Sequence, residues 1–320
     1  MSRPLIVITG PTATGKTALG VALGKALDGE VVSADSMQLY RYMDIGTAKP
    51  TPEECGGVPH HMLDVADPSE SYSVSRYVQD AARCVDDILA RGKQPLLVGG
   101  TGLYIDSLLA GTDFAAAPED PALREALSGE YDAIGGEAFR EMLRQVDPLR
   151  AEKLAPGDKK RLVRALEVYR LTGETITAHD ERTRALPPRY PYLRFALTYN
   201  DRETLYERID RRVDEMLERG LLREVEELLR RGLTEKHTAM QAIGYKEPAE
   251  ALLGKCTPEE AVEAVKQSSR RYAKRQLTWL RREKDVIWLP REDYPTTEAL
   301  CEKVLQTLRL SSTDSANRSL

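Results

Sequence analysis

The sequence has few cysteines, and none of them are paired at the spacing of a metal site. Cys55, Cys84, Cys256 and Cys301 lie far apart in 320 residues, without a Cys-x-x-Cys pair. This pattern excludes a disulfide framework and a zinc finger, and a reducing compartment is expected. No apolar run reaches the length of about 18 residues that a membrane span needs. The first residues lead into a strand-like segment instead of a signal peptide, so we expect a cytoplasmic protein outside the membrane.

The chain also lacks an overall excess of positive charge, so its average composition points to no polyanionic partner. It has 46 lysines and arginines against 51 aspartates and glutamates, a net charge of −5. The average hides residues 266–284, where eight basic residues and one acid give +7 against −12 elsewhere. Thr257-Pro258-Glu259-Glu260 is typical of a helix start, so we predict one basic helix here. Cations four residues apart on one helix face repel each other, which indicates a polyanionic partner.

Three short apolar runs in the first hundred residues predict β-strands, and helical patterns separate them. The runs are Leu5–Ile8, Val31-Val32 and Leu96–Val98, and each ends in a polar or glycine-rich turn. Alternating strands and helices are typical of a parallel sheet. Ligands of open parallel sheets bind at the carboxyl ends of the strands. The three turns are therefore the first candidates for a functional site.

The first of these turns carries a phosphate-binding motif. A Gly-x-x-x-x-Gly-Lys-Thr sequence follows a predicted strand and precedes a predicted helix, as a P-loop requires. Its glycines let backbone N–H groups surround phosphate oxygens, Lys16 adds positive charge, and the Thr17 hydroxyl can bind Mg²⁺. The motif predicts a diphosphate or triphosphate site made by Gly10, Pro11, Thr12, Ala13, Thr14, Gly15, Lys16 and Thr17.

A P-loop does not by itself identify the reaction. Most P-loops bind ATP or GTP, so a kinase or NTPase is the first expectation. Asp35 follows the second predicted strand. At that position a carboxylate can hold Mg²⁺ or act as a general base towards an acceptor, and the spacing leaves both roles open.

The remaining sequence indicates that a helical segment interrupts the sheet. Residues 114–194 are rich in Ala, Glu and Arg, and prolines separate short helical patterns there. Strand-like runs return at Phe195–Thr198 and Val286–Leu289. We therefore predict an α/β fold, a P-loop-type parallel sheet flanked by helices, with a mostly helical insertion domain. The core would comprise residues 1–113 and 195–310, the insertion domain 114–194, and a polar, disordered tail 311–320.

Several sequence blocks beyond the P-loop resemble those of one family. Between about residue 4 and residue 290 they follow one another as in the bacterial tRNA dimethylallyltransferases, which the chain closely resembles. The blocks are Ser33–Tyr40, Met43–Pro50, Val58–Asp64, Gly99–Tyr104, Arg164–Tyr169, Met240–Tyr245 and Tyr272–Trp279. Their number and order make the resemblance specific, although none of these blocks would carry it alone.

The resemblance implies transfer of a dimethylallyl group from dimethylallyl diphosphate to N6 of the adenosine 3′-adjacent to the tRNA anticodon, with Mg²⁺. The P-loop would hold the diphosphate leaving group. By the same resemblance, Asp35 takes the proton from N6, and Thr101 hydrogen-bonds near the diphosphate or the amine. Arg208 and Arg212 share one helix face. They form either a diphosphate clamp, with Arg212 as the better candidate, or a solvated charged face.

The resemblance also implies contacts between several segments and tRNA. The adenine must leave its stack to react, and the residues beside Asp35 are candidates to receive it. The basic turn at Lys159–Arg161 opposes the dipole of its predicted helix, which favours phosphate contacts there. The candidate tRNA-binding residues are Asp35, Ser36, Met37, Gln38, Thr101, Lys159, Lys160, Arg161, Leu162, Val163, Met240, Gln241, Ala242, Ile243, Gly244, Tyr245, Arg271, Lys274 and Arg275. We expect a monomer.

Three other functions remain open at this point. A P-loop kinase or NTPase would turn over ATP. A prenyltransferase acting on free adenine nucleotides would have little need of the basic helix. A non-catalytic RNA-binding protein with a relict phosphate loop would not depend on Asp35.

Overall fold

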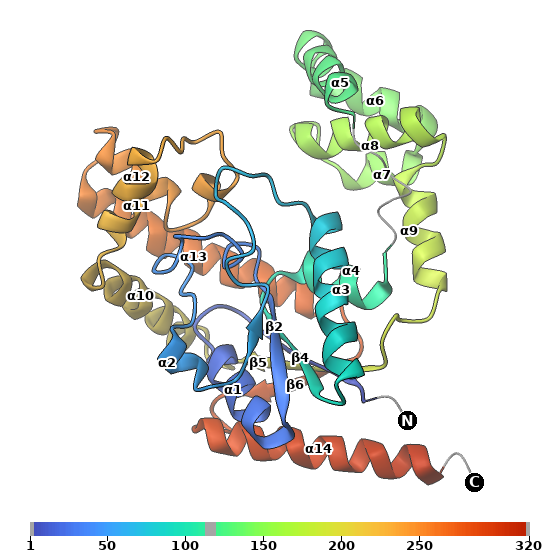
Figure 1. Cartoon of the computed structure of the whole chain (residues 1–320). Coiled ribbons are helices and arrows are strands. Elements are labelled where there is room, and N and C mark those ends of the chain that lie inside the picture. The colour runs from blue at the N-terminus through green and yellow to red at the C-terminus, as the bar shows by residue number, and fades with distance from the viewer. Residues whose placement is uncertain (1–2, 113–119, 318–320) are drawn as a thin grey trace. The chain divides into compact units, whose positions relative to one another are not determined.

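Six strands form a sheet in the larger of the two compact units of the computed structural model (Figure 1). The structure describes residues 3–112 and 120–317, with side chains up to residue 310. The larger unit consists of Met1–Leu108 and Tyr190–Leu320, and the smaller unit of Leu109–Arg189. The sequence predicted an insertion domain at residues 114–194, whereas the smaller unit spans Leu109–Arg189. Residues 113–119 lie outside the described part of the chain.

The strands lie in the order β3-β2-β4-β1-β5-β6, and every neighbouring pair is parallel. All residues of β1, β2 and β4 are buried, as expected for a parallel sheet that helices cover. The strands are β1 (Leu5–Thr9), β2 (Gly29–Ala34), β3 (His60–His61), β4 (Gln94–Gly99), β5 (Tyr192–Thr198) and β6 (Val286–Pro290). The predicted α/β class with a parallel sheet is confirmed.

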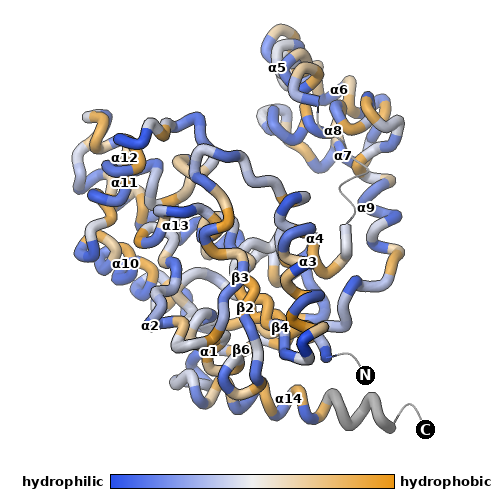
Figure 2. Tube along the Cα trace, in the orientation of Figure 1, coloured by the Kyte–Doolittle hydropathy of each residue, from blue (hydrophilic) through white to orange (hydrophobic). Residues whose placement is uncertain are grey.

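Helices α1 (Lys16–Leu27) and α14 (Thr297–Asn317) pack together on the sheet (Figure 1). Their Leu19 and Leu300 share a hydrophobic core with Ile8 of β1. Helix α3 (Val74–Ala90) packs on β2 and β4, α4 (Gly102–Ala110) follows β4, and α2 (Pro52–Cys55) precedes β3. Figure 2 shows the apolar residues concentrated in the strands. Burying one such side chain stabilises the fold by about 2 kcal/mol. The many buried side chains of the strands therefore hold the sheet, and with it the loops at the strand ends, in place.

Helices α10 (Arg202–Glu218), α11 (Leu221–Arg230), α12 (Lys246–Leu252) and α13 (Pro258–Leu280) follow β5, with a 3₁₀ turn at Ala239–Gln241. Gly220 separates α10 from α11 with a φ of 102°, a conformation that glycine adopts without strain. Helix α13 packs against both α10 and α12. It therefore forms the centre of this helical layer.

The start of α13 agrees with the sequence prediction, but its end does not. The Thr257 hydroxyl accepts the N–H of Glu260, and the Glu260 carboxylate accepts the N–H of Thr257, so the predicted capping box is confirmed. The basic stretch was predicted as one helix, whereas α13 ends at Leu280. The chain has to turn here because β6 begins at Val286. The last basic residues, 281–284, lie in that turn.

The sequence predicted a polar, disordered tail over residues 311–320, the segment in which the last helix ends. Helix α14 continues to Asn317, and residues 318–320 lie outside the described part. Leu300 and Val304 anchor the start of this helix in the core. The polar segment contains neither glycine nor proline, so nothing in it interrupts a helix that has already formed.

The smaller unit is helical throughout its described residues. It consists of α5 (Pro121–Ile134), α6 (Gly136–Val146), α7 (Pro148–Lys153), α8 (Lys159–Thr172) and α9 (Ile176–Ala185). Pro121 and Pro148 each occupy the first turn of a helix, where a missing N–H costs nothing. Phe139 and Leu143 of α6 pack against α8 in a core of the unit's own. The described residues of the whole chain contain no helix long and apolar enough to cross a membrane.

Candidate active site

The P-loop, Gly10–Thr17, connects β1 to α1 as predicted. Gly10 has a φ of 137°, and a Cβ atom there would lie 2.3 Å from the carbonyl oxygen of Leu197. Gly15 has a φ of 90° and gives α1 no side-chain cap. The first N–H groups of α1 are therefore left for a ligand, and together with the helix dipole they favour an anion.

A cavity of about 500 Å³ opens over this loop. Its lining includes P-loop residues, strand ends and two helices that follow β5. Its polar and charged members include Thr12, Lys16, Thr17, Asp35, Arg208, Arg212 and Gln276. Three of these side chains are cationic, so the cavity is suited to a diphosphate.

Arg208 and Arg212 both contact the P-loop from α10. Arg208 donates from Nε to the carbonyl oxygen of Ala13 at 3.2 Å. Arg212 donates from Nη1 to the Thr12 hydroxyl at 3.3 Å. The interpretation as a merely solvated charged face is therefore wrong, because both guanidinium groups lie in the phosphate cavity.

The cations of this cavity lie close enough to disfavour one another. Burial, and after it the charge of Arg212, lower the pKa of Lys16 to about 7, while Asp35 raises it. Burial also lowers the pKa of Arg212. The Lys16 ammonium donates to the carbonyl oxygen of Pro11 at 2.8 Å. A bound anion would therefore reduce the repulsion between these cations.

Asp35 and Thr101 come together because each follows one of two neighbouring strands. Asp35 follows β2 and Thr101 lies just beyond β4. The two strand ends touch, since a Cβ atom on Gly99 would lie 2.3 Å from the carbonyl oxygen of Ala34. The Thr101 hydroxyl accepts the backbone N–H of Ser36 at 3.1 Å. Thr101 itself lines neither cavity, so in this structure its hydroxyl holds the Asp35 turn.

The Asp35 carboxylate uses one of its two oxygens within the protein. Oδ1 accepts the backbone N–H groups of Met37 at 2.9 Å and Gln38 at 3.3 Å. Within the described part of the chain, Oδ2 has no hydrogen-bond partner. One oxygen thus fixes the orientation of the carboxylate and the other is available to a substrate proton.

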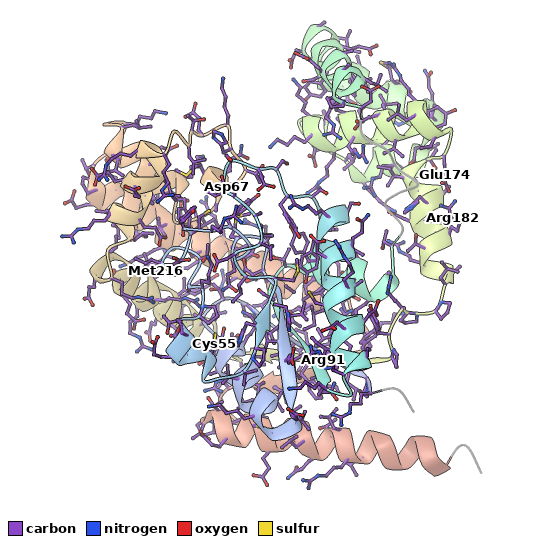
Figure 3. All side chains as sticks on the ribbon, in the orientation of Figure 1. Cys55, Asp67, Arg91, Glu174, Arg182 and Met216 are labelled. Atoms are coloured by element: carbon purple, nitrogen blue, oxygen red, sulfur yellow. The ribbon has the colours of Figure 1, made fainter. Side chains whose placement is uncertain are left out.

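A second cavity, of about 290 Å³, also has Asp35 in its lining. Its walls come from Ser36 and Met37, from Gly46, from residues 241–244, and from α13. Six residues line both cavities: Thr12, Asp35, Thr47, Arg212, Met216 and Tyr272. Figure 3 labels Met216, on α10. The Asp35 carboxylate thus stands where the two cavities meet.

Several residues predicted to contact tRNA have roles within the protein. Gln38 lines the first cavity, and its amide donates to the carbonyl oxygens of Thr47 and Ala48. The side chains of Met240 and Tyr245 are buried, whereas Gln241 is exposed. The side chains that the segment from Met240 offers to the second cavity are therefore those of Gln241, Ala242 and Ile243.

Two residues of α13 line the site although their sequence pattern did not single them out. Gln276 is 6% exposed and bonds both the P-loop and the turn after β4. Tyr272 lines both cavities, and burial raises its pKa to about 12. Both belong to the block Tyr272–Trp279, which carries the resemblance. Helical periodicity alone does not indicate what they contact, because that depends on which element faces α13.

The basic face of α13 is smaller than predicted. Lys266 pairs with Asp214 at 2.6 Å, and Arg270 pairs with Asp210 of the same neighbouring helix. These two cations are neutralised within the protein. The basic residues exposed on and just after α13 are Arg271, Lys274, Arg275, Arg281, Arg282 and Lys284, and they make up the face that a polyanion can reach.

In the basic turn of the smaller unit, too, some of the cations have ion-pair partners within the protein. Lys159 pairs with Asp132 at 2.6 Å. Asp158 does not cap α8 with its side chain but pairs with Arg161 at 3.0 Å. Leu162 and Val163 were predicted to contact tRNA, but they are buried in the core of this unit. Among the described residues, Lys160 is the cation of this turn that is exposed without an ion-pair partner.

The chain matches two family models and many sequences. The model described as IPP transferase matches residues 38–283, and the model described as isopentenyl transferase matches residues 4–69. The chain is 44% identical over 306 residues to the tRNA dimethylallyltransferase of Lachnoclostridium phytofermentans, covering 96% of this chain and 97% of that one. It is 46% identical over 305 residues to that of Carboxydothermus hydrogenoformans, covering 95% and 97%.

Solved structures that resemble this chain are of enzymes of the same kind. The tRNA isopentenylpyrophosphate transferase of Bacillus halodurans is 40% identical, with a TM-score of 0.72 over 99% of this chain and 100% of that one. A eukaryotic dimethylallyltransferase, whose structures capture it acting on tRNA, is 32% identical, with a TM-score of 0.77 over 90% and 74%. The resemblance predicted from the sequence blocks is confirmed.

Proposed function

The chain belongs to the IPP transferase family, that of the tRNA dimethylallyltransferases, and we propose that it transfers a dimethylallyl group from dimethylallyl diphosphate to tRNA. The acceptor is N6 of the adenosine 3′-adjacent to the anticodon. The observation that carries this proposal is the position of Asp35, between a cationic cavity over the P-loop and a second cavity. A donor and an acceptor can thus approach one carboxylate from two sides.

The P-loop side binds the leaving group. As the bond between the dimethylallyl carbon and the diphosphate oxygen breaks, negative charge grows on the diphosphate. The N–H groups at the start of α1, the Lys16 ammonium and the two guanidinium groups of α10 stabilise that charge without having to reorganise. This stabilisation makes diphosphate a good leaving group at an allylic carbon.

Thr17 fits a role in holding Mg²⁺. It lines the phosphate cavity beside Lys16, and its hydroxyl has no hydrogen-bond partner within the described part of the chain. Mg²⁺ in phosphate sites takes few protein ligands and completes its shell with phosphate oxygens and water. When bound, the ion neutralises charge on the diphosphate. The described residues contain no cluster of three His, Cys, Asp or Glu side chains that would hold a metal by themselves.

Asp35 serves the acceptor. The N6 nitrogen forms its new bond to the dimethylallyl carbon as the carbon–oxygen bond to diphosphate breaks, and the nitrogen then carries an extra proton. Oδ2 of Asp35 takes that proton, while Oδ1 stays bonded to the Met37 and Gln38 N–H groups. An exocyclic amine is a weak nucleophile, so a positioned base contributes most as the nitrogen–carbon bond forms.

The tRNA is bound through exposed cations. Arg271, Lys274 and Arg275 of α13 are exposed, and Arg275 also lines the second cavity. Phosphate contacts by these side chains orient the anticodon loop, and the adenine leaves its stack to enter the second cavity. Lys160 of the smaller unit provides a further cation. We propose that the protein is a monomer and that it acts in the cytoplasm.

The test is transfer of label from radiolabelled dimethylallyl diphosphate to purified tRNA, followed by mass analysis of the tRNA nucleosides. We expect one adenosine to gain an isopentenyl group. AMP as acceptor and ATP as sole substrate are the comparison reactions. Label that enters AMP as fast as tRNA contradicts the tRNA assignment, and release of phosphate from ATP without prenyl transfer contradicts the reaction.

A further inference from the structure

The segment from Met43 to Pro50 has no strand and no helix, yet it forms a wall of both cavities. Thr47 lines both cavities, and Gly46 lines the second. Two backbone hydrogen bonds form turns within this segment, from Ala48 to Ile45 and from Lys49 to Asp44, and several of its other backbone groups bind side chains. The position of this wall therefore depends on the polar side chains that bind its backbone.

The half of this wall nearer the P-loop is held by the side chain of Gln38 and by Lys49, which is a residue of the wall itself. The Gln38 amide donates to the carbonyl oxygens of Thr47 and Ala48. The ammonium of the buried Lys49 pairs with the carboxylates of Asp44 and Asp64, each at 2.6 Å. Neither partner involves the segment from Met240 that lines the second cavity.

The half nearer the second cavity is held by a residue of another helix. Glu224 of α11 accepts the consecutive backbone N–H groups of Asp44 at 3.0 Å, Ile45 at 2.8 Å and Gly46 at 3.1 Å. The Tyr245 hydroxyl donates to the same carboxylate at 2.6 Å. An ionised carboxylate is purely an acceptor, so it can take all four donors at once.

The Tyr245 ring completes the connection. It is fully buried, and a Cβ atom added to Gly46 would lie 2.5 Å from its Cε2 atom. The ring therefore packs directly on the Gly46 backbone. Residues 241–244, which precede Tyr245, line the second cavity. Glu224 thus joins two of the walls of that cavity, the one at Gly46 and the one at residues 241–244.

We propose that Glu224 is a positioning residue that holds the acceptor cavity in the shape that receives the flipped adenine. Glu224 lines neither cavity, so it acts through the two walls that it joins. The inference rests on the proposed function, because it concerns the cavity assigned there to the tRNA base. The diphosphate side has ties of its own through Gln38, Lys49 and the arginines of α10. Loss of Glu224 therefore affects the acceptor more than the donor.

The experiment compares Glu224→Gln with Glu226→Gln on the same helix. In the first variant the new amide N–H₂ would face donors, so at least one of the two walls loses its partner, whereas Glu226 is an exposed partner of Arg230. Steady-state rates are measured against tRNA and against dimethylallyl diphosphate, with thermal melting of each variant. We expect E224Q to lower kcat/KM for tRNA about tenfold to hundredfold by raising KM. The KM for dimethylallyl diphosphate should change less than about twofold.

The other outcomes decide against the inference. A purely structural role reduces the active fraction, which lowers kcat for both substrates and leaves both KM values unchanged. An E224Q variant that behaves like E226Q, or raises both KM values alike, overturns the inference while the proposed function stands. If E224Q does not fold, Tyr245→Phe decides, because it removes one hydroxyl and should raise the tRNA KM about fivefold. Wild-type protein that leaves tRNA unlabelled overturns the proposed function and this inference with it.

Discussion

The side-chain oxygen of Gln276 accepts a hydrogen bond from the backbone N–H of Thr12 at 3.1 Å. The amide of the same side chain donates to the carbonyl oxygen of Gly100 at 2.9 Å. One buried residue of α13 therefore ties the P-loop to the turn after β4. A Cβ atom on Gly100 would lie 2.2 Å from Gln276 Nε2, so this contact also explains the glycine.

Gln276→Leu should weaken donor binding. The change keeps most of the side-chain volume but leaves the Thr12 N–H and the Gly100 carbonyl without partners, at about 1–3 kcal/mol each. We expect a KM for dimethylallyl diphosphate that is raised about tenfold, together with a lower Tm. Thr278→Ala, at an exposed position of the same helix, is the control. An unchanged KM in Q276L would show that the P-loop holds its shape without this bond.

Asp35→Asn should separate chemistry from binding. The Asn oxygen can still accept the N–H groups of Met37 and Gln38, so the turn keeps its conformation, but an amide cannot take the N6 proton. We expect kcat to fall about a hundredfold to ten-thousandfold. The Kd for tRNA, measured by filter binding, should change little. If D35N keeps wild-type turnover, Asp35 is not the base.

Donor binding should depend on the charge of Lys16. In the free enzyme burial and Arg212 lower the pKa of Lys16 to about 7, and a bound diphosphate would raise it because the anion favours the ammonium. Above about pH 7 binding therefore takes up a proton, and affinity falls as pH rises, by up to about tenfold per unit. Below that pH the lysine is already charged, so the affinity levels off.

Calorimetry of dimethylallyl diphosphate in buffers of different ionisation enthalpy measures this proton uptake. Lys16→Met should abolish it and bind more weakly at low pH. Affinity that stays constant across about pH 6.5 to 9 would contradict the assignment.

The exposed cations of α13 should be separable from the paired ones by salt dependence. Arg271→Ala and Lys274→Ala each remove a cation without an ion-pair partner in the described part of the chain. Each change should reduce the slope of log Kd for tRNA against log salt by about 1. Lys266→Ala removes a cation that Asp214 already neutralises, and should leave the slope unchanged. Equal slopes for all three variants would show that the ion pair opens when tRNA binds.

Local sequence was sufficient for the phosphate site. Gly10 and Gly15 are needed for backbone conformations within a few residues of each other, and Asp35 directly follows a strand. The same reasoning did not show that Leu162 and Val163 are buried, since a basic turn does not tell which neighbouring side chains face a core. It also failed for Lys266, whose partner lies on another helix.

Sequence by itself therefore determined the strands β1, β2 and β4, the phosphate loop and the family, because these depend on short spacings and on ordered blocks along the chain. Only the tertiary structure decided which polar side chains connect loops that are distant in sequence. Gln276 reaches Thr12 across 264 positions, and Glu224 reaches Gly46 across 178. Each hydrogen bond needs its donor and acceptor within about 3 Å, and that proximity is fixed by how the helices pack on the sheet.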